Sequence, residues 1–255
     1  MNSVACHEEF RATEMSHKAA HKHTKAGRNH PAIDPGFAVT RNGFHIRVSP
    51  SDGPVRRNVD QLIQRMYASR GLSTSQPIAP PSPPPTLQTT LIASQGDRVF
   101  GTLTVGVDTG AGLLADTLYR PQIDVARGQG ARVCEVTRLA MDPELNSQEA
   151  LGAIFHLGFI IARFIHGMTD LFAEVHPRHV PYYRRMLGYR VAGPNLICPR
   201  VGAPAVLMHL PLSHAEQETL RHGGNKHSRD RSLYQRFFSP VEQGQILRQL
   251  NLEAA

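Results

Sequence analysis

A glutamate and an arginine stand three residues apart, as Glu135 and Arg138, in a β-branched run that predicts a strand over residues 132–141. A carboxylate in a partly buried site can accept a proton from an amine. A forked guanidinium matches the geometry of a second carboxylate. The pair could therefore deprotonate an amine and hold an acid, or it could be a structural ion pair at the edge of the core.

The two side chains would point to opposite faces of a regular strand, because side chains alternate with a period of two. A β-bulge between Glu135 and Arg138 would bring both to one side. Bulges often re-aim side chains beside active sites. The proposed chemistry therefore depends on a bulge within this strand.

The segments around this strand show the periodicities of strands and helices. Strands predominate before Glu135 and alternate with helices after it, which predicts an α+β fold. We expect a mixed, mostly antiparallel sheet with helices on both faces. The expected elements are a single strand at 37–48, a helix from Pro54 that stops at Gly71, a hairpin of 87–93 and 98–107, one or two short helices at 113–127 broken near Pro121, the strand at 132–141, a helix at 147–166, a strand at 169–175, a helix at 178–187 and a last strand at 205–210.

The chain is expected to contain one domain, over residues 37–222, flanked by polar segments. Residues 1–36 contain histidines and lysines without apolar periodicity and are interpreted as a disordered tail. Residues 76–86 are proline-rich and are expected to form a stiff loop. Residues 223–255 are interpreted as a polar linker followed by an amphipathic helix near 241–252.

Two stretches, Glu135-Val-Thr-Arg138 and residues 177–189, resemble the long-chain N-acyl amino acid synthases and, more distantly, the acyl-homoserine-lactone synthases. The resemblance covers about residues 37–212. It implies a GNAT-like N-acyltransferase fold with a bulge on the central strand. It also implies an enzyme that joins a medium or long fatty acyl chain to the α-amine of an amino acid.

The resemblance implies a role for individual residues. Glu135 would assist deprotonation of the amine, Arg138 would position Glu135 or the substrate carboxylate, and Tyr183 would protonate the departing thiolate. Tyrosine also packs well at the rim of a core, so a structural role for Tyr183 stays open. The residues expected to line the substrate site are Arg132, Thr137, Phe155, Phe159, His176 and Tyr182, although a turn or a supporting hydrogen bond is the simpler account of His176.

The helix expected at 147–166 is apolar on most of its faces, which indicates burial. A large core would explain this pattern. A fatty acyl tunnel beside the helix would explain it equally well, with Gly152 and Gly158 leaving space for the chain. Cys134 is interpreted as a buried, inert thiol.

The acyl donor is expected to be acyl carrier protein, and acyl-CoA is the weaker alternative. Members of this fold that use coenzyme A usually carry a glycine-rich loop after the central strand, whereas residues 142–152 are acidic and contain no glycine pair. No metal or organic cofactor is implied. The side chains expected to dock the carrier, unless they form an ordinary solvated basic surface, are Arg178, Arg184, Arg185 and Arg190.

Composition excludes several classes of protein. The formal net charge is +7, but no arginine-rich run is interleaved with exposed aromatics, so nucleic-acid binding is not expected. The apolar run at 151–165 is interrupted by His156 and Arg163 and falls short of the ~20 residues of a bilayer span. No signal peptide is recognisable, and the three widely spaced cysteines favour the cytoplasm. A peripheral contact with a membrane stays open.

Two other functions remain as alternatives. An acyl-homoserine-lactone synthase would share the donor and the Glu-x-x-Arg core. Those enzymes also carry an N-terminal set that includes tryptophan and binds S-adenosylmethionine, and this chain has no tryptophan. The same fold could instead serve as a non-catalytic module that binds acyl chains or their carrier, because fold does not determine function.

Overall fold

The computed structural model describes residues 31, 33–69, 71, 87–145, 147–225 and 231–250. Its strands are β1 (Ala38–Arg41), β2 (Phe44–Val48), β3 (Leu87–Gln95), β4 (Arg98–Val107), β5 (Val133–Met141), β6 (Asp170–Val175), β7 (Arg190–Cys198) and β8 (Ala203–Pro211). Its α-helices are α1 (Gly53–Ala68), α2 (Asp116–Gly128), α3 (Gln148–Ile160), α4 (Val180–Leu187), α5 (Leu212–His222) and α6 (Pro240–Gln249). Three short helical segments complete the set: η1 (Ile161–Ile165), η2 (Pro177–His179) and η3 (Leu233–Arg236).

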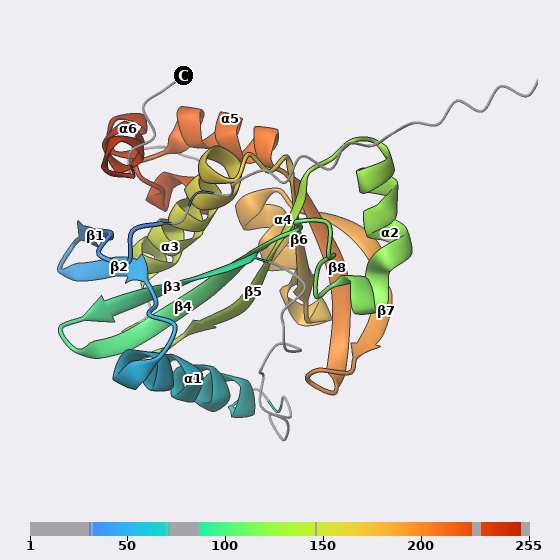
Figure 1. Ribbon diagram of the computed structural model, residues 1–255, viewed down its shortest axis with the longest axis horizontal. Helices are drawn as coiled ribbons and strands as arrows, with labels where there is room; N and C mark the ends of the chain where they lie inside the picture. Colours follow the sequence, from blue (N-terminus) through green and yellow to red (C-terminus); the bar gives the residue numbers. More distant parts are fainter. Residues whose placement is uncertain are drawn as a thin grey trace, which may run out of the picture.

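The strands form one eight-stranded sheet in the order β1-β2-β3-β4-β5-β6-β8-β7 (Figure 1). Within it, β5 and β6 are parallel, and the other neighbouring strands are antiparallel. This arrangement confirms the predicted mixed, mostly antiparallel α+β fold.

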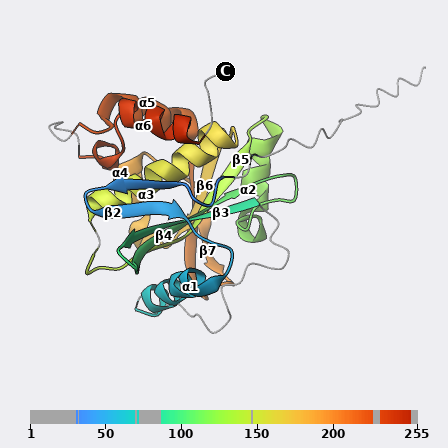
Figure 2. The same cartoon turned by 60° about the vertical axis from the view of Figure 1, so that its left-hand side comes forward.

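Helices cover both faces of the sheet, as predicted (Figures 1 and 2). On one face, α1 packs against Ile92 and Ala140, and α2 packs against Val133 and Phe172. On the other face, α3 and α4 share a large core with Leu91, Leu103 and the C-terminal elements. The two faces therefore contain separate apolar clusters, divided by the strands themselves.

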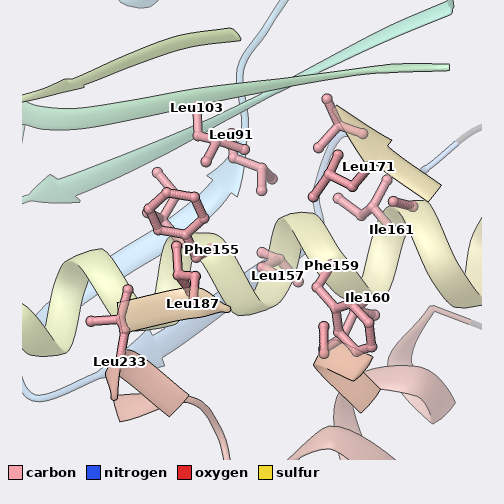
Figure 3. Packing of buried hydrophobic residues seen from close by; sticks show 14 of the residues in the cluster. Leu91, Leu103, Phe155, Leu157, Phe159, Ile160, Ile161, Leu171, Leu187 and Leu233 are labelled. Carbon is pink, nitrogen blue, oxygen red and sulfur yellow. The ribbon is translucent and has the colours of Figure 1, made fainter. Parts of the chain in front are cut away.

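Helix α3 is the central helix of the larger core. Ser147 caps its start by accepting a hydrogen bond from the Ala150 amide at 3.1 Å. Its apolar side chains lie between the sheet and the C-terminal elements, as Figure 3 shows for Phe155 and Leu157 of α3 and Leu233 of η3. The stretch Gln148–Ile165 is long and apolar enough to cross a membrane, but 67% of it is buried inside the protein. Burial on both sides accounts for its apolar character as a core helix.

The C-terminal elements η3 and α6 are attached to α3 through His156. The Nδ1 atom of His156 accepts a hydrogen bond from the Phe238 amide at 2.8 Å, and Nε2 lies 2.9 Å from the side-chain oxygen of Gln243. Burial lowers the pKa of His156 to about 3, so the ring is neutral. The predicted C-terminal helix is thus present as α6 and docks on the body of the domain.

Gly152 and Gly158 do not leave space for an acyl chain, so of the two explanations that the sequence left open for this helix, a large core fits the packing at these glycines. A Cβ atom on Gly152 would lie 2.4 Å from Cβ and 2.8 Å from the carbonyl oxygen of Arg236. A Cβ atom on Gly158 would lie 3.0 Å from the side chain of Leu103. Both glycines permit close packing of α3, one against η3 and one against the sheet.

Substituting Gly152 with alanine is expected to destabilise the protein by about 1–3 kcal/mol, because the new methyl group overlaps Arg236. The matched control is Gly244→Ala in α6, where the nearest atom to an added Cβ is Nη1 of Arg248 at 3.7 Å. That control should be neutral or stabilising by up to ~1 kcal/mol. Urea unfolding of both variants measures the difference, and equal stability of the two would contradict the close contact between α3 and η3.

One predicted element differs from the structure, and two observed elements, β7 and α5, were not predicted. The single strand expected at 37–48 is the hairpin β1–β2, which turns at Asn42 and Gly43 with φ angles of 49° and 80°. An Asn-Gly pair between alternating residues is the local signal for such a hairpin. Strand β7 was missed because Gly193 and Pro194 interrupt its pattern, and helix α5 was not assigned. The proline-rich loop at 76–86, and all of the expected tail except residue 31 and residues 33–36, lie outside the described residues.

Candidate active site

Strand β5 contains the predicted bulge. Thr137 pairs with Thr104, and Ala140 pairs with Thr102, so Arg138 and Leu139 together oppose a single residue of β4. Arg138 has a φ angle of 52°, in the left-handed region that few residues other than glycine adopt. The bulge therefore begins at Arg138.

The bulge places Arg138 on the same face of the sheet as Glu135. Glu135 faces the side of α1 and α2, as its register with Gly106 and Phe172 requires. Burial lowers the pKa of Arg138, the nearby guanidinium of Arg56 lowers it further, and the α1 residues Asp60 and Tyr67 oppose this. These neighbours place the guanidinium of Arg138 beside α1, so Arg138 and Glu135 lie on the same face of the sheet.

Strand β5 also separates from β6 at this point. The parallel ladder runs from Val133 paired with Asp170 to Val136 paired with Ala173. Strand β5 continues to Met141, whereas β6 ends at Val175 and the chain enters η2 and α4 (Figure 1). The bulge, the end of the ladder and the start of α4 therefore belong to one region.

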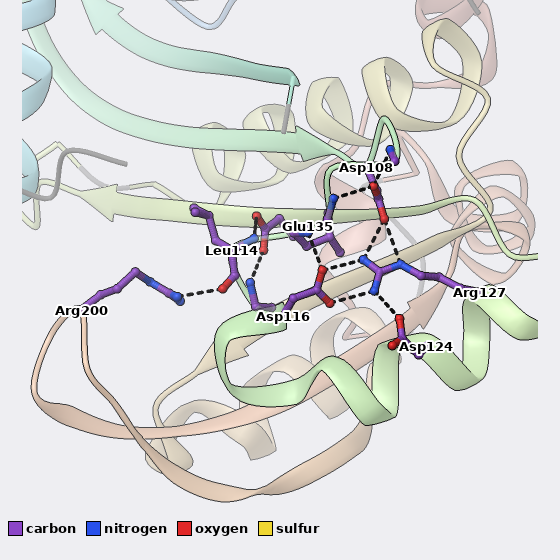
Figure 4. Close-up of polar contacts among 11 residues, drawn as sticks. Asp108, Leu114, Asp116, Asp124, Arg127, Glu135 and Arg200 are labelled. Atoms are coloured by element: carbon purple, nitrogen blue, oxygen red, sulfur yellow. Dashed lines mark hydrogen bonds and ion pairs between the residues drawn. The ribbon is translucent and has the colours of Figure 1, made fainter. Parts of the chain in front are cut away.

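Glu135 is held by the loop before α2. Its side chain accepts hydrogen bonds from the amides of Leu114 at 2.8 Å and Ala115 at 3.1 Å (Figure 4). Only 2% of Glu135 is exposed. Burial raises its pKa to about 7, because the two amides and Arg200 compensate only in part and Asp116 adds a further negative charge. A carboxyl group with this pKa can exchange a proton near neutral pH.

A network of ion pairs holds the loop before α2 in place. Arg127 of α2 lies 2.7 Å from both Asp108 and Asp116, and 2.6 Å from Asp124 (Figure 4). Asp108 also accepts hydrogen bonds from the amides of Gly110 and Gly112. The amides that orient Glu135 are therefore held in place by contacts on both sides of the loop.

Two residues that the sequence did not reveal, Glu174 and Arg200, complete the site. Arg200 lies in the turn between β7 and β8, and its Nη1 atom donates to the carbonyl of Leu114 at 2.9 Å. Its Nη2 atom donates to Oε2 of Glu174 on β6. Burial lowers the pKa of Arg200, and Glu135 and Tyr67 act in the opposite direction. The one available signal for Glu174 was an acidic residue in the interior of the strand 170–175, whose only other polar residue is Asp170 at its start.

The predicted tyrosines lie on α4, in the core on the α3 side of the sheet. Tyr183 is buried and packs edge-on against Tyr189 at 5.3 Å and Phe155 at 6.4 Å between ring centroids. Tyr182 is half-buried, and burial raises its pKa. Thr137 is half-buried between Glu135 and the bulge.

Three predicted substrate residues lie elsewhere. Arg132 is exposed just before β5, where a Cβ atom on Gly167 would lie 3.4 Å from its guanidinium. The ring of Phe159 contacts Phe164 and His156 in the large core. His176 caps η2 by accepting a hydrogen bond from the Arg178 amide at 3.3 Å, which agrees with the turn role. The structure does not bring these side chains into contact with Glu135.

The four arginines expected to dock a carrier protein are all exposed, on η2, on α4 and at the first residue of β7. Cys134 is a free, buried thiol, and burial raises its pKa well above its usual value, as expected for an inert residue. Within the part of the chain that the structure describes, no group of three or more His, Cys, Asp or Glu side chains could hold a metal ion.

Comparisons with known proteins identify the family and the fold of this chain. Residues 58–211 match the family model of the N-acyl amino acid synthase FeeM. The solved structure of FeeM, an N-acyl amino acid synthase from uncultured soil microbes, is 23% identical, with a TM-score of 0.56 over 67% of this chain and 90% of that chain. The acyl-homoserine-lactone synthase LasI is 14% identical, with a TM-score of 0.43 over 66% of this chain and 90% of that chain. A putative N-acetyltransferase from Lactobacillus plantarum is 19% identical, with a TM-score of 0.45 over 67% and 99% of the two chains. The search of curated proteins finds no match.

Proposed function

This chain belongs to the FeeM family of N-acyl amino acid synthases and is an acyltransferase of the GNAT-like fold, and from this premise we propose its reaction. It transfers a medium or long fatty acyl chain from acyl carrier protein to the α-amine of an amino acid. The observation that carries this proposal is the bulge at Arg138, which presents a guanidinium on the same face as a carboxyl group with a pKa of about 7.

In the proposed mechanism, Glu135 accepts a proton from the α-ammonium group directly or through one water. The free amine attacks the thioester carbonyl, and amides at the bulge stabilise the resulting oxyanion. The carbon–sulfur bond breaks, and Tyr183, or Tyr182 beside it, gives a proton to the departing thiolate. The attacking nitrogen loses its second proton as the amide forms, and this proton restores the tyrosine. The products are an N-acyl amino acid and the free thiol of the carrier.

The environment of Glu135 supports a role as the base. A general base works best when its pKa lies near the operating pH, and burial brings this carboxyl group there. Each carboxylate oxygen accepts one amide hydrogen bond and retains a second lone pair. The amides of Leu114 and Ala115 thus orient the Glu135 carboxylate, which can still accept further hydrogen bonds.

The region before α3 supports a carrier protein as the donor rather than coenzyme A. Asp142 precedes this helix and is held by Arg65 at 2.7 Å and Arg98 at 2.9 Å. Glu149 lies in the first turn of α3. Glu149 is in turn paired with Arg236 at 2.7 Å, so both acidic groups near this helix start are already engaged by arginines. The support for a carrier protein is therefore that residues 142–152 lack the glycine pair whose amides would bind a pyrophosphate. The proposed donor and substrates also favour a cytoplasmic location.

Reversing the charge of Arg184 and Arg185 together is expected to raise the KM for acyl carrier protein about tenfold or more at low salt, because docking of an acidic partner would be electrostatic. The KM for the amino acid should not change. The double variant Arg120→Glu, Arg248→Glu removes two exposed arginines from α2 and α6 and provides the matched control. Equal KM values for the two double variants would show that α4 is not the docking surface.

The masses of new products test the proposed function. Lipid extracts of cells that express the protein should contain N-acyl amino acids that are absent from control cells. Acyl-homoserine lactones in their place would identify a lactone synthase. No new product, together with retained binding of acyl carrier protein, would identify a binding module.

A further inference from the structure

Glu174 has a carboxylate oxygen that no described group uses. Its Oε2 atom binds Arg200, whereas its Oε1 atom is buried and has no hydrogen-bond partner among the described residues. The side chain is only 9% exposed. Buried acceptors in folded proteins nearly always have a donor, so this oxygen is suited to a donor that arrives with a ligand.

The position of Glu174 relates this oxygen to the active site. Phe172 pairs with Glu135, and Ala173 pairs with Val136 in the last step of the β5–β6 ladder. Glu174 is the next residue of β6, two positions after Phe172, and therefore faces the same side as Phe172 and Glu135. It lies where the two strands separate, beside the bulge that presents Arg138.

The charges around Glu174 match those of a free amino acid. Arg200 contacts Glu174 and also acts on the ionisation of Glu135, so it lies between two acidic groups. Tyr67 is within electrostatic range of both Arg200 and Arg138, which relates the second cation to the same group of side chains. A zwitterion requires an anionic acceptor for its ammonium group and a cationic fork for its carboxylate.

We propose that Glu174 binds the α-ammonium group of the amino acid substrate through Oε1, while Arg138 holds the α-carboxylate. This inference rests on the proposed function and adds the residue that recognises the amine. The ion pair with Arg200 orients Glu174. Glu174 and Glu135 then have separate tasks: the first holds the ammonium group in place, and the second receives its proton.

Arg200 is the more exposed partner of this ion pair. The Arg200 side chain is 29% exposed and lies in the turn between β7 and β8, whereas the Glu174 carboxylate is enclosed. An ammonium group bound at Oε1 would be shielded from water, which strengthens a charge-assisted hydrogen bond. Recognition of the amine should therefore contribute strongly to binding of the amino acid.

The variant Glu174→Gln tests this inference, with the amino acid that the wild-type product contains as the probe. The KM for this amino acid should rise roughly 10- to 100-fold, because one charge-assisted hydrogen bond is lost. The KM for acyl carrier protein should not change. Glu216→Gln is the matched control, because Glu216 forms an ion pair with Arg163 at 3.0 Å on α5 in another part of the molecule. Glu174→Asp, which retains the charge, should recover part of the lost affinity.

A second measurement does not depend on how well the variants fold. The 2-hydroxy acid counterpart of the same amino acid lacks the ammonium group and should inhibit the wild-type enzyme with an affinity at least tenfold weaker than that of the amino acid. Equal affinity for the two compounds would overturn the role of Glu174, as would an unchanged amino acid KM in Glu174→Gln. In both cases the wild-type product still forms, so the proposed function stands. A wild-type enzyme that makes no acyl amino acid refutes the proposed function itself.

Discussion

Replacing Glu135 with glutamine is expected to lower kcat by about 100- to 10,000-fold, the usual contribution of a general base. Glutamine retains the shape of the side chain and one oxygen that can accept from the Leu114 or Ala115 amide. The KM for acyl carrier protein should stay the same. Steady-state kinetics measures these values, with Glu144→Gln, an exposed carboxylate that binds Arg98, as the control.

The pH dependence of the wild-type enzyme should identify the same group. Glu135 must be deprotonated to accept a proton, so kcat/KM should rise about tenfold per pH unit in acid and level off above a pH of about 7. The Glu135→Gln variant should lose this dependence. Full activity in the variant would remove Glu135 from the chemistry and leave it as the anchor of the loop before α2.

Stability should depend on pH in the opposite direction. The pKa of Glu135 is raised from 4.5 to about 7 in the folded protein, so the folded state keeps a proton that the unfolded chain has released. The free energy of unfolding should therefore fall as pH rises between these two values, by roughly 3 kcal/mol in total from this group. Denaturant unfolding at several pH values should show this fall in the wild type and its absence in Glu135→Gln.

Replacing Arg138 with glycine is expected to raise the KM for the amino acid about a hundredfold or more, because a buried guanidinium that pairs with the substrate carboxylate is removed. Glycine adopts a φ angle of 52° without strain, so the free energy of unfolding regains about 1 kcal/mol. This gain offsets part of the stability that is lost with the packing of the side chain. Activity should therefore fall far more than stability. Kinetics and urea unfolding on the same preparation separate the two effects.

Arg138→Lys provides the comparison for this prediction. It retains the positive charge but loses the fork that matches a carboxylate, so its amino acid KM should lie between those of the wild type and the glycine variant. If the glycine variant has the wild-type KM, Arg138 serves only the bulge. In that case Arg138 contributes the backbone conformation of the bulge, and its guanidinium does not bind the amino acid.

Local sequence patterns predicted most elements of the fold. The 147–166 helix, the strand at 132–141 and the break near Pro121 follow from periodicity and from backbone chemistry that neighbouring residues determine. In α2 the kink falls at Tyr119, with a φ angle of −126°, two residues before the proline. The turn of the hairpin at Asn42 and Gly43 is also determined by neighbouring residues, because the Asn-Gly pair itself favours it.

The candidate site was predictable only in part, for a physical reason. The sequence alone indicated Glu135 and Arg138 and the need for a bulge, because both residues lie on one strand. Glu174 lies on β6 and Arg200 in the turn between β7 and β8, and Arg200 contacts Glu174 and Leu114 across 26 and 86 residues of sequence. Only the order of the strands brings such residues together. In the same way, the packing of η3 on α3 decided that Arg236 fills the space beside Gly152. The spacing of residues thus determined the pair on β5, whereas the packing of distant segments decided its partners.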